Sequence, residues 1–204
     1  MAEPYLNPLN SLCLFNLDKY LEKFINLYKQ KKLPKVLMVS GKKGEGKFSL
    51  IFHLLNFIFD EKYDLSNKKI NKDSFFYKSV INAINPNVYF YGLSEENVKI
   101  EDIRNLKNIL SKSTINQKPR FIILNEIENF NINSLNALLK SIEEPSLNTH
   151  FILINNNKII LETIKSRSIE FKINLNTKEK QIIIEKLINK LEITKLLHFE
   201  NYDL

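Results

Sequence analysis

The chain has 204 residues, 44% of them hydrophobic and 26% charged, which fits one α/β domain plus a small appendage. No run of about 18 uncharged apolar residues occurs, so we expect no transmembrane helix, and the N-terminus lacks the basic start and apolar core of a signal peptide. The single cysteine, Cys13, excludes an internal disulfide and a cysteine-rich zinc site. We therefore expect a cytoplasmic protein that does not bind a membrane.

The net charge of +7 arises almost entirely from lysine, because only Arg104, Arg120 and Arg167 are arginines. A basic balance can indicate an acidic partner such as nucleic acid. The lysines are scattered along the chain, however, and Asn and Ile are also frequent. This pattern favours a general compositional preference over a dedicated DNA-binding surface, which stays open as the alternative.

In the first half of the chain, apolar residues at helical spacing predict a helix over 17–32. A short buried strand is expected at 35–40, and after a glycine-rich turn an almost wholly apolar helix at 48–59. Residues 60–85 are rich in Lys and Asn and weakly patterned, so we interpret them as an irregular or mobile insertion.

The second half alternates strands with helices. The predicted elements are a strand at 88–91, a helix at 99–111, a strand at 120–124, a helix at 132–143, a strand at 151–154, a short helix at 159–165 and a strand at 168–173. Thr177 is then expected to cap a helical region that reaches about residue 197. This alternation predicts an α/β fold with a parallel five-stranded sheet covered by helices on both faces, which binds ligands at the carboxyl ends of its strands.

Residues 41–47 (GKKGEGK) have the spacing of a phosphate-binding loop, G-x-x-x-x-G-K, between a strand and a helix. Gly41, Gly44 and Gly46 would let backbone N–H groups converge on phosphate oxygens, and the helix N-terminus adds partial positive charge. Lys47 would reach the outer phosphates as a point charge. The alternative is a glycine turn that binds no ligand.

The residue after the loop lysine departs from this pattern. The motif requires Ser or Thr there, whose hydroxyl binds magnesium, but this chain has Phe48. Ser49 comes one residue late, and one residue on a helix is a rotation of about 100°, so its hydroxyl would point away from the metal. The loop could hold a polyphosphate with an impaired magnesium site.

The predicted strand at 120–124 continues into Asn125 and Glu126. In a P-loop ATPase this Walker-B position carries Asp-Glu, where the Asp holds magnesium and the Glu polarises the attacking water. Asn125 is neutral and cannot offset the charge of the metal. With Phe48, it predicts weak or absent ATP hydrolysis. Glu126 considered alone is equally consistent with a solvated acid at the end of a strand.

Three segments together give a family resemblance: the loop GKKGEGK, the strand FIILNEIE, and the stretch from NALLKSIEEPSLNTHFILI to IKSRS. They resemble the clamp-loader AAA+ proteins, and among these the gamma/tau and delta-prime subunits of bacterial DNA polymerase III. The resemblance covers residues 33–173. It implies a P-loop AAA+ fold of three layers with a following helical lid.

The resemblance also implies roles for two residues. Arg167 matches the family's Ser-Arg-Cys arginine, which acts as an arginine finger on ATP bound to the neighbouring subunit, although Ser168 replaces the Cys. Without the resemblance, one arginine before a strand is most often a surface charge. Asn155, at the end of the fourth strand, stands where the family carries its polar sensor-1 residue.

Impaired magnesium positions beside a retained Arg167 match the delta-prime type, which typically offers its arginine but hydrolyses no ATP. The implied function is that of a clamp-loader subunit of the DNA polymerase III holoenzyme in DNA replication. The implied partners are gamma/tau and delta subunits, the sliding clamp, and primer–template DNA through the assembly. Two alternatives stay open: an active ATPase of the gamma/tau type, and a purely structural AAA+ interaction protein.

The chain departs from the family in two places. The segment 60–85 contains no cysteine, so the family's four-cysteine zinc module is not expected, and we expect no metal site. We assign residues 1–174 to the AAA+ domain and residues 175–204 to part of a helical lid. Because this sequence ends inside that lid, we expect the usual C-terminal collar domain to be absent from it.

Overall fold

Five short segments, most of them strongly apolar, form one parallel sheet in the order β2-β3-β4-β1-β5. The strands are β1 (Val36–Ser40), β2 (Val88–Tyr91), β3 (Arg120–Leu124), β4 (Thr149–Asn155) and β5 (Ile169–Lys172). Every residue of β1 and β3 is buried, as expected for central strands covered on both faces. The computed structural model describes residues 8–93, 98–111 and 118–191.

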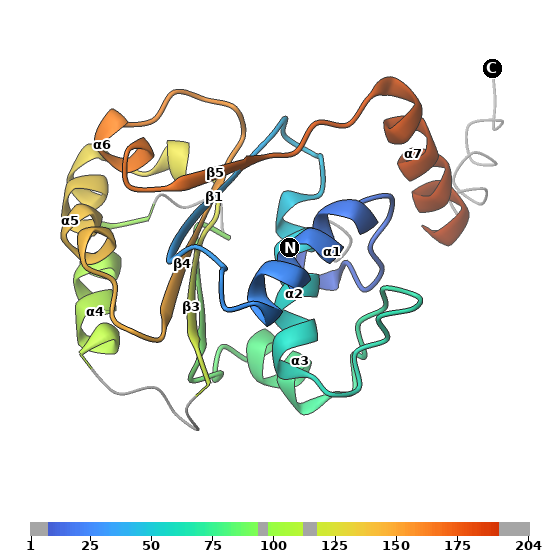
Figure 1. Ribbon diagram of the computed structural model, residues 1–204, viewed down its shortest axis with the longest axis horizontal. Coiled ribbons are helices and arrows are strands. Elements are labelled where there is room, and N and C mark those ends of the chain that lie inside the picture. The colour runs from blue at the N-terminus through green and yellow to red at the C-terminus, as the bar shows by residue number, and fades with distance from the viewer. Residues whose placement is uncertain (1–7, 94–97, 112–117, 192–204) are drawn as a thin grey trace, which may run out of the picture.

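Helices cover both faces of this sheet and make three layers (Figure 1). One layer contains α1 (Asp18–Lys29), α2 (Lys47–Phe59) and α3 (Phe75–Ile81), and the opposite layer contains α4 (Ile100–Leu110), α5 (Ile132–Glu143) and α6 (Glu162–Lys165). After β5 the chain continues into α7 (Thr177–Leu191), which lies beyond the α1–α2 layer in Figure 1. The expected α/β fold of five parallel strands between helices is confirmed.

The sheet divides the apolar residues into two cores because strand side chains alternate between its faces. Leu37 and Val39 of β1 belong to the core beneath α1 and α2, whereas Val36 and Met38 belong to the core beneath α4 and α5. Nearly all of α2 is buried, which explains why its sequence is apolar all round. None of the described helices is long and apolar enough to cross a membrane.

The expectation of an irregular segment at 60–85 is wrong for part of that range. Residues 75–81 form α3, whose N-terminus is capped by the Ser74 hydroxyl accepting a hydrogen bond from Tyr77 N–H at 3.1 Å. Phe76 and Val80, one turn apart, are buried against α2. A helix of seven residues gives too few repeats for its periodicity to stand out among lysines and asparagines.

Two smaller expectations also need correction. The helix predicted at 159–165 is only the single turn of α6, and Ile159 is 98% exposed. Thr177 does not cap α7; Asn176 does, because its Oδ1 accepts from Glu179 N–H while its own N–H donates to Glu179 Oε2. The predicted extension of this helix to residue 197 lies partly outside the described residues.

Candidate functional site: a phosphate-binding loop and an arginine on opposite sides of the sheet

The glycine-rich loop joins the carboxyl end of β1 to the N-terminus of α2. It starts beside the end of β4, where Gly41 N–H donates to the Asn155 carbonyl at 3.2 Å. Gly44 and Gly46 have φ values of +84° and +74°, a left-handed conformation that favours glycine. Gly46 directly precedes the first turn of α2, so the loop has the strand–loop–helix context that phosphate binding requires.

Lys47 is folded back onto this loop. Its side chain is almost fully buried, and its ammonium donates to the Gly41 carbonyl at 2.9 Å and the Lys42 carbonyl at 2.7 Å. Burial lowers the pKa of Lys47 below its ordinary value, and the carboxylates of Glu45, Glu128 and Glu126 partly oppose that shift. The loop carbonyls therefore bind the Lys47 ammonium, which a phosphate-binding loop would use to bind a phosphate.

Phe48 is a core residue rather than a ligand. Its ring centroid lies 5.5 Å from that of Phe90 and 6.3 Å from that of Phe52, and only 8% of the residue is exposed. Ser49 is half-buried on the next position of α2. The position that would supply a magnesium-binding hydroxyl is therefore part of an aromatic cluster.

Asn125 and Glu126 follow β3 at the same edge of the sheet. The Asn125 amide Nδ2 donates to the Gly92 carbonyl at 3.0 Å, which joins the ends of β3 and β2. Glu126 has a left-handed backbone (φ +49°), and its carboxylate lies 3.0 Å from the Lys43 ammonium of the phosphate loop. Glu126 is thus adjacent to the loop, whereas the Asn125 side chain is used in a structural contact.

These residues do not fit a magnesium ion. A hard divalent cation needs several oxygen ligands with negative charge, but an aromatic ring and a neutral amide stand at the two positions concerned. In the parts of the chain that the structure describes, no group of three or more His, Cys, Asp or Glu side chains is placed to hold a metal. The glycine-rich loop itself retains the geometry of a phosphate-binding loop.

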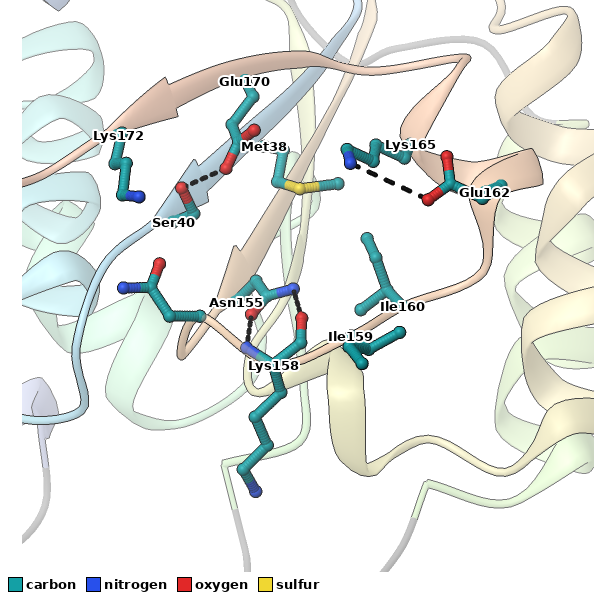
Figure 2. A pocket seen from close by; sticks show the side chains of 11 residues that line it. Met38, Ser40, Asn155, Lys158, Ile159, Ile160, Glu162, Lys165, Glu170 and Lys172 are labelled. Carbon is teal, nitrogen blue, oxygen red and sulfur yellow. Dashed lines mark hydrogen bonds and ion pairs between the residues drawn. The ribbon is translucent and has the colours of Figure 1, made fainter.

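Asn155 lines a separate cavity of about 450 Å³, which is bounded by residues of β1 and β5, by the end of β4 and by the segment that follows β4 into α6 (Figure 2). Its side chain donates to the Lys158 carbonyl at 3.0 Å and accepts from Lys158 N–H at 2.9 Å, so it closes the turn after β4. On the other side of the cavity the Ser40 hydroxyl donates to the Glu170 carboxylate (Figure 2). The predicted sensor-1 residue is therefore close to the loop through its backbone, while its side chain orders a turn.

Arg167 lies in the turn between α6 and β5. Its Nη2 is 2.7 Å from Oε1 of Glu143 at the end of α5, and its Nη1 donates to the Thr163 carbonyl at 2.9 Å. The side chain is 36% exposed. α5 and α6 cover the face of the sheet opposite to α2 (Figure 1). Arg167 and the helix that continues the phosphate loop are therefore on opposite sides of the sheet.

The structure adds residues that the sequence analysis missed. Glu45, in the middle of the loop, is 5% exposed and forms an ion pair with Lys180 of α7 at 3.0 Å. The sequence shows an acid at this position of the motif, but its burial could not be predicted from the sequence. The roles of Lys180 and of Glu143, the partner of Arg167, carried no sequence signal, because only the fold brings these residues to the site.

The sheet order, the loop after β1 and the acidic residue after β3 define a P-loop AAA+ domain. The fold matches a crystal structure of a DNA polymerase III gamma subunit-related protein from Thermotoga maritima with a TM-score of 0.56 and 20% identity. That match covers 88% of this chain and 52% of the other.

The chain belongs to the family described as "DNA polymerase III, delta subunit", whose family model matches residues 17–177. A stretch of 78 residues is 33% identical to DNA polymerase III subunit delta' of Pseudomonas aeruginosa and covers 38% of this chain. Another of 91 residues is 34% identical to subunit delta' of Buchnera aphidicola and covers 44% of this chain. These matches span about a quarter of each relative, 24% and 27%.

Proposed function

We propose that this chain is a clamp-loader subunit of the delta-prime type in DNA replication. It assembles with gamma/tau and delta subunits, and through that assembly it acts on the sliding clamp and on primer–template DNA. The family match over 17–177 and the two relatives named delta' support this proposal. In the assembly it supplies Arg167 to the ATP site of a neighbour and hydrolyses no ATP at its own loop.

The observation that carries the proposal is the placement of Arg167. Its guanidinium is on the surface, on the α5–α6 side of the sheet, while the phosphate loop leads into α2 on the other side. A planar guanidinium binds phosphate oxygens bidentately and neutralises the charge that develops during phosphoryl transfer. From this place it serves a phosphate on another subunit rather than one in its own loop.

The proposed absence of ATP hydrolysis at the chain's own loop rests on residues 48 and 125, the two positions at which such enzymes bind magnesium. Without a hydroxyl at residue 48 and a carboxylate at residue 125, the metal that neutralises the β- and γ-phosphates in such enzymes lacks its protein ligands. Lys47 and Glu126 do not replace those ligands, because the first is a cation and the second pairs with Lys43.

The test is Arg167→Ala in a loader reconstituted with purified gamma/tau and delta subunits. An arginine finger accelerates phosphoryl transfer roughly 10³-fold or more, so DNA-stimulated ATPase should fall to the rate of the sites that Arg167 does not serve. Arg104→Ala is the matched control, since Arg104 is an exposed arginine paired with Glu101 on α4. Equal ATPase rates for the wild type and Arg167→Ala would overturn the proposal.

The retained Lys47 and Glu126 favour a second candidate, an active ATPase of the gamma/tau type. That function requires the isolated chain to turn over magnesium-ATP and requires Lys47→Ala to abolish the turnover. Our proposal expects no ATP turnover by the isolated wild-type chain or by Lys47→Ala. A chain that neither turns over ATP nor associates with gamma/tau and delta subunits in a pull-down would instead be a structural AAA+ interaction protein.

A further inference from the structure

The phosphate loop contains an anion of its own. Both carboxylate oxygens of Glu45 have partners: Oε2 accepts from the Lys42 N–H at 2.8 Å, and Oε1 lies 3.0 Å from the Lys180 ammonium. The residue is 5% exposed, whereas the Lys180 side chain is 37% exposed. A carboxylate removed from water to this degree requires such partners. The loop and α7 are therefore joined by a buried charge.

The backbone of the loop packs closely around this carboxylate. A methyl group at Gly41 would lie 2.8 Å from Glu45 Oε2 and 2.8 Å from the Ile173 carbonyl. Only a residue without a side chain allows the carboxylate to approach the start of the loop. The position of Glu45 is thus part of how the loop folds rather than a contact at its edge.

The cations around the loop are engaged within the chain as well. Lys47 donates to two loop carbonyls, Lys43 pairs with Glu126, and Lys180 pairs with Glu45. A phosphate-binding loop attracts its ligand through free N–H groups and positive charge. Here an incoming polyphosphate meets the negative charge of Glu45, and the nearby ammonium groups must first exchange partners.

We propose that Glu45 is an internal counter-anion that joins the loop to α7 and lowers the affinity of the loop for nucleoside triphosphates. This inference rests on the part of the proposed function that treats residues 41–47 as a phosphate loop. A loop with a low affinity for nucleoside triphosphates gains little from magnesium ligands, which is consistent with Phe48 and Asn125 at the two positions that would supply them. α7 stays attached to the loop without a bound nucleotide, because the Glu45 carboxylate supplies the negative charge that pairs with Lys180.

The test is equilibrium binding of ATP, with and without magnesium, to the full 204-residue chain by calorimetry. Glu45→Gln keeps the size of the side chain and removes its charge, so it should bind ATP at least about tenfold tighter than the wild type. Glu61→Gln, an exposed acid just beyond the other end of α2, makes the same charge change and should bind like the wild type. An affinity of Glu45→Gln equal to or weaker than that of the wild type overturns the inference.

Lys180→Met provides a second measurement. It leaves the Glu45 carboxylate in the loop without its cation, so ATP should bind no tighter than to the wild type, and hydrogen exchange of the α7 amides should accelerate at least about tenfold. Lys178→Met, in the same turn of α7, should change neither quantity. Unchanged exchange of α7 in Lys180→Met also overturns the inference. These measurements use the isolated chain, whereas the Arg167 test uses the ATPase of the assembly, so either idea can fail without the other.

Discussion

Arg167 and Glu143 form an ion pair across the gap between the α6–β5 turn and the end of α5, with Nη2 and Oε1 2.7 Å apart. The two side chains are 36% and 45% exposed. Ion pairs between exposed side chains contribute about 0–1 kcal/mol, since water solvates both partners well. Glu143 therefore fixes the direction of the guanidinium but can release it at a small cost in free energy.

Glu143→Gln should accordingly lower the free energy of unfolding by less than about 1 kcal/mol. Urea unfolding followed by circular dichroism measures this difference. Glu101→Gln, which removes the exposed pair with Arg104, is the matched control and should have an equally small effect. A loss of more than about 2 kcal/mol in Glu143→Gln alone would show that the pair stabilises the fold rather than orients Arg167.

Phe48→Thr restores the residue type of a phosphate-binding motif, and we expect it to destabilise the protein. The ring is buried against Phe52 and Phe90, and replacing a buried aromatic ring by a small side chain costs about 3–5 kcal/mol. Phe48→Leu keeps most of the volume and should cost clearly less. Urea unfolding of both variants checks this order; equal stabilities would show that the aromatic cluster contributes nothing to the fold.

The strand and helix pattern was predictable where apolar periodicity was long or glycine and proline marked the ends. The strands at 88–91 and 120–124 and the helix at 132–143 have the predicted boundaries. α3 was missed because its seven residues sit in a Lys- and Asn-rich segment, and its cap, Ser74, is a common loop residue. The sheet order could be inferred only through the family resemblance, since strand pairing is a long-range property.

The candidate site was predictable as far as its motifs are continuous in the sequence. The loop at 41–47 could be predicted from its spacing, Asn125 with Glu126 from their place after an apolar strand, and Arg167 only from the family resemblance. The structure brings Glu126 to Lys43 of the loop. The partners of these residues could not be marked, because Lys180 is 135 positions from Glu45 in the numbering and meets it only when α7 packs beside the loop. Pairing between distant charges depends on the fold and leaves no local pattern.

Asn155→Ala should destabilise the protein by about 1–3 kcal/mol. Its side chain makes hydrogen bonds to both the N–H and the carbonyl of Lys158, and each such bond contributes about 0.5–1.5 kcal/mol net. Asn26→Ala, at an exposed position of α1, is the control and should be neutral or slightly stabilising because alanine favours helix. Thermal unfolding of the two variants makes the comparison. A neutral Asn155→Ala would contradict a structural role for this side chain.

The attachment of α7 to α1 should weaken in acid. Glu179 of α7 lies 2.9 Å from the Lys19 ammonium, and this hydrogen bond, together with the Asn176 N–H, lowers the pKa of Glu179. A carboxyl whose pKa is lowered in the folded state stabilises the contact above its ordinary pKa and loses that contribution as the pH falls through the lowered value. Hydrogen exchange of α7, corrected for intrinsic rates, should therefore accelerate as the pH falls from about 5 to about 3. Glu179→Gln should show faster exchange already at the higher pH and a smaller change on acidification. If the wild type and Glu179→Gln responded to pH equally, another acid would control the attachment of α7.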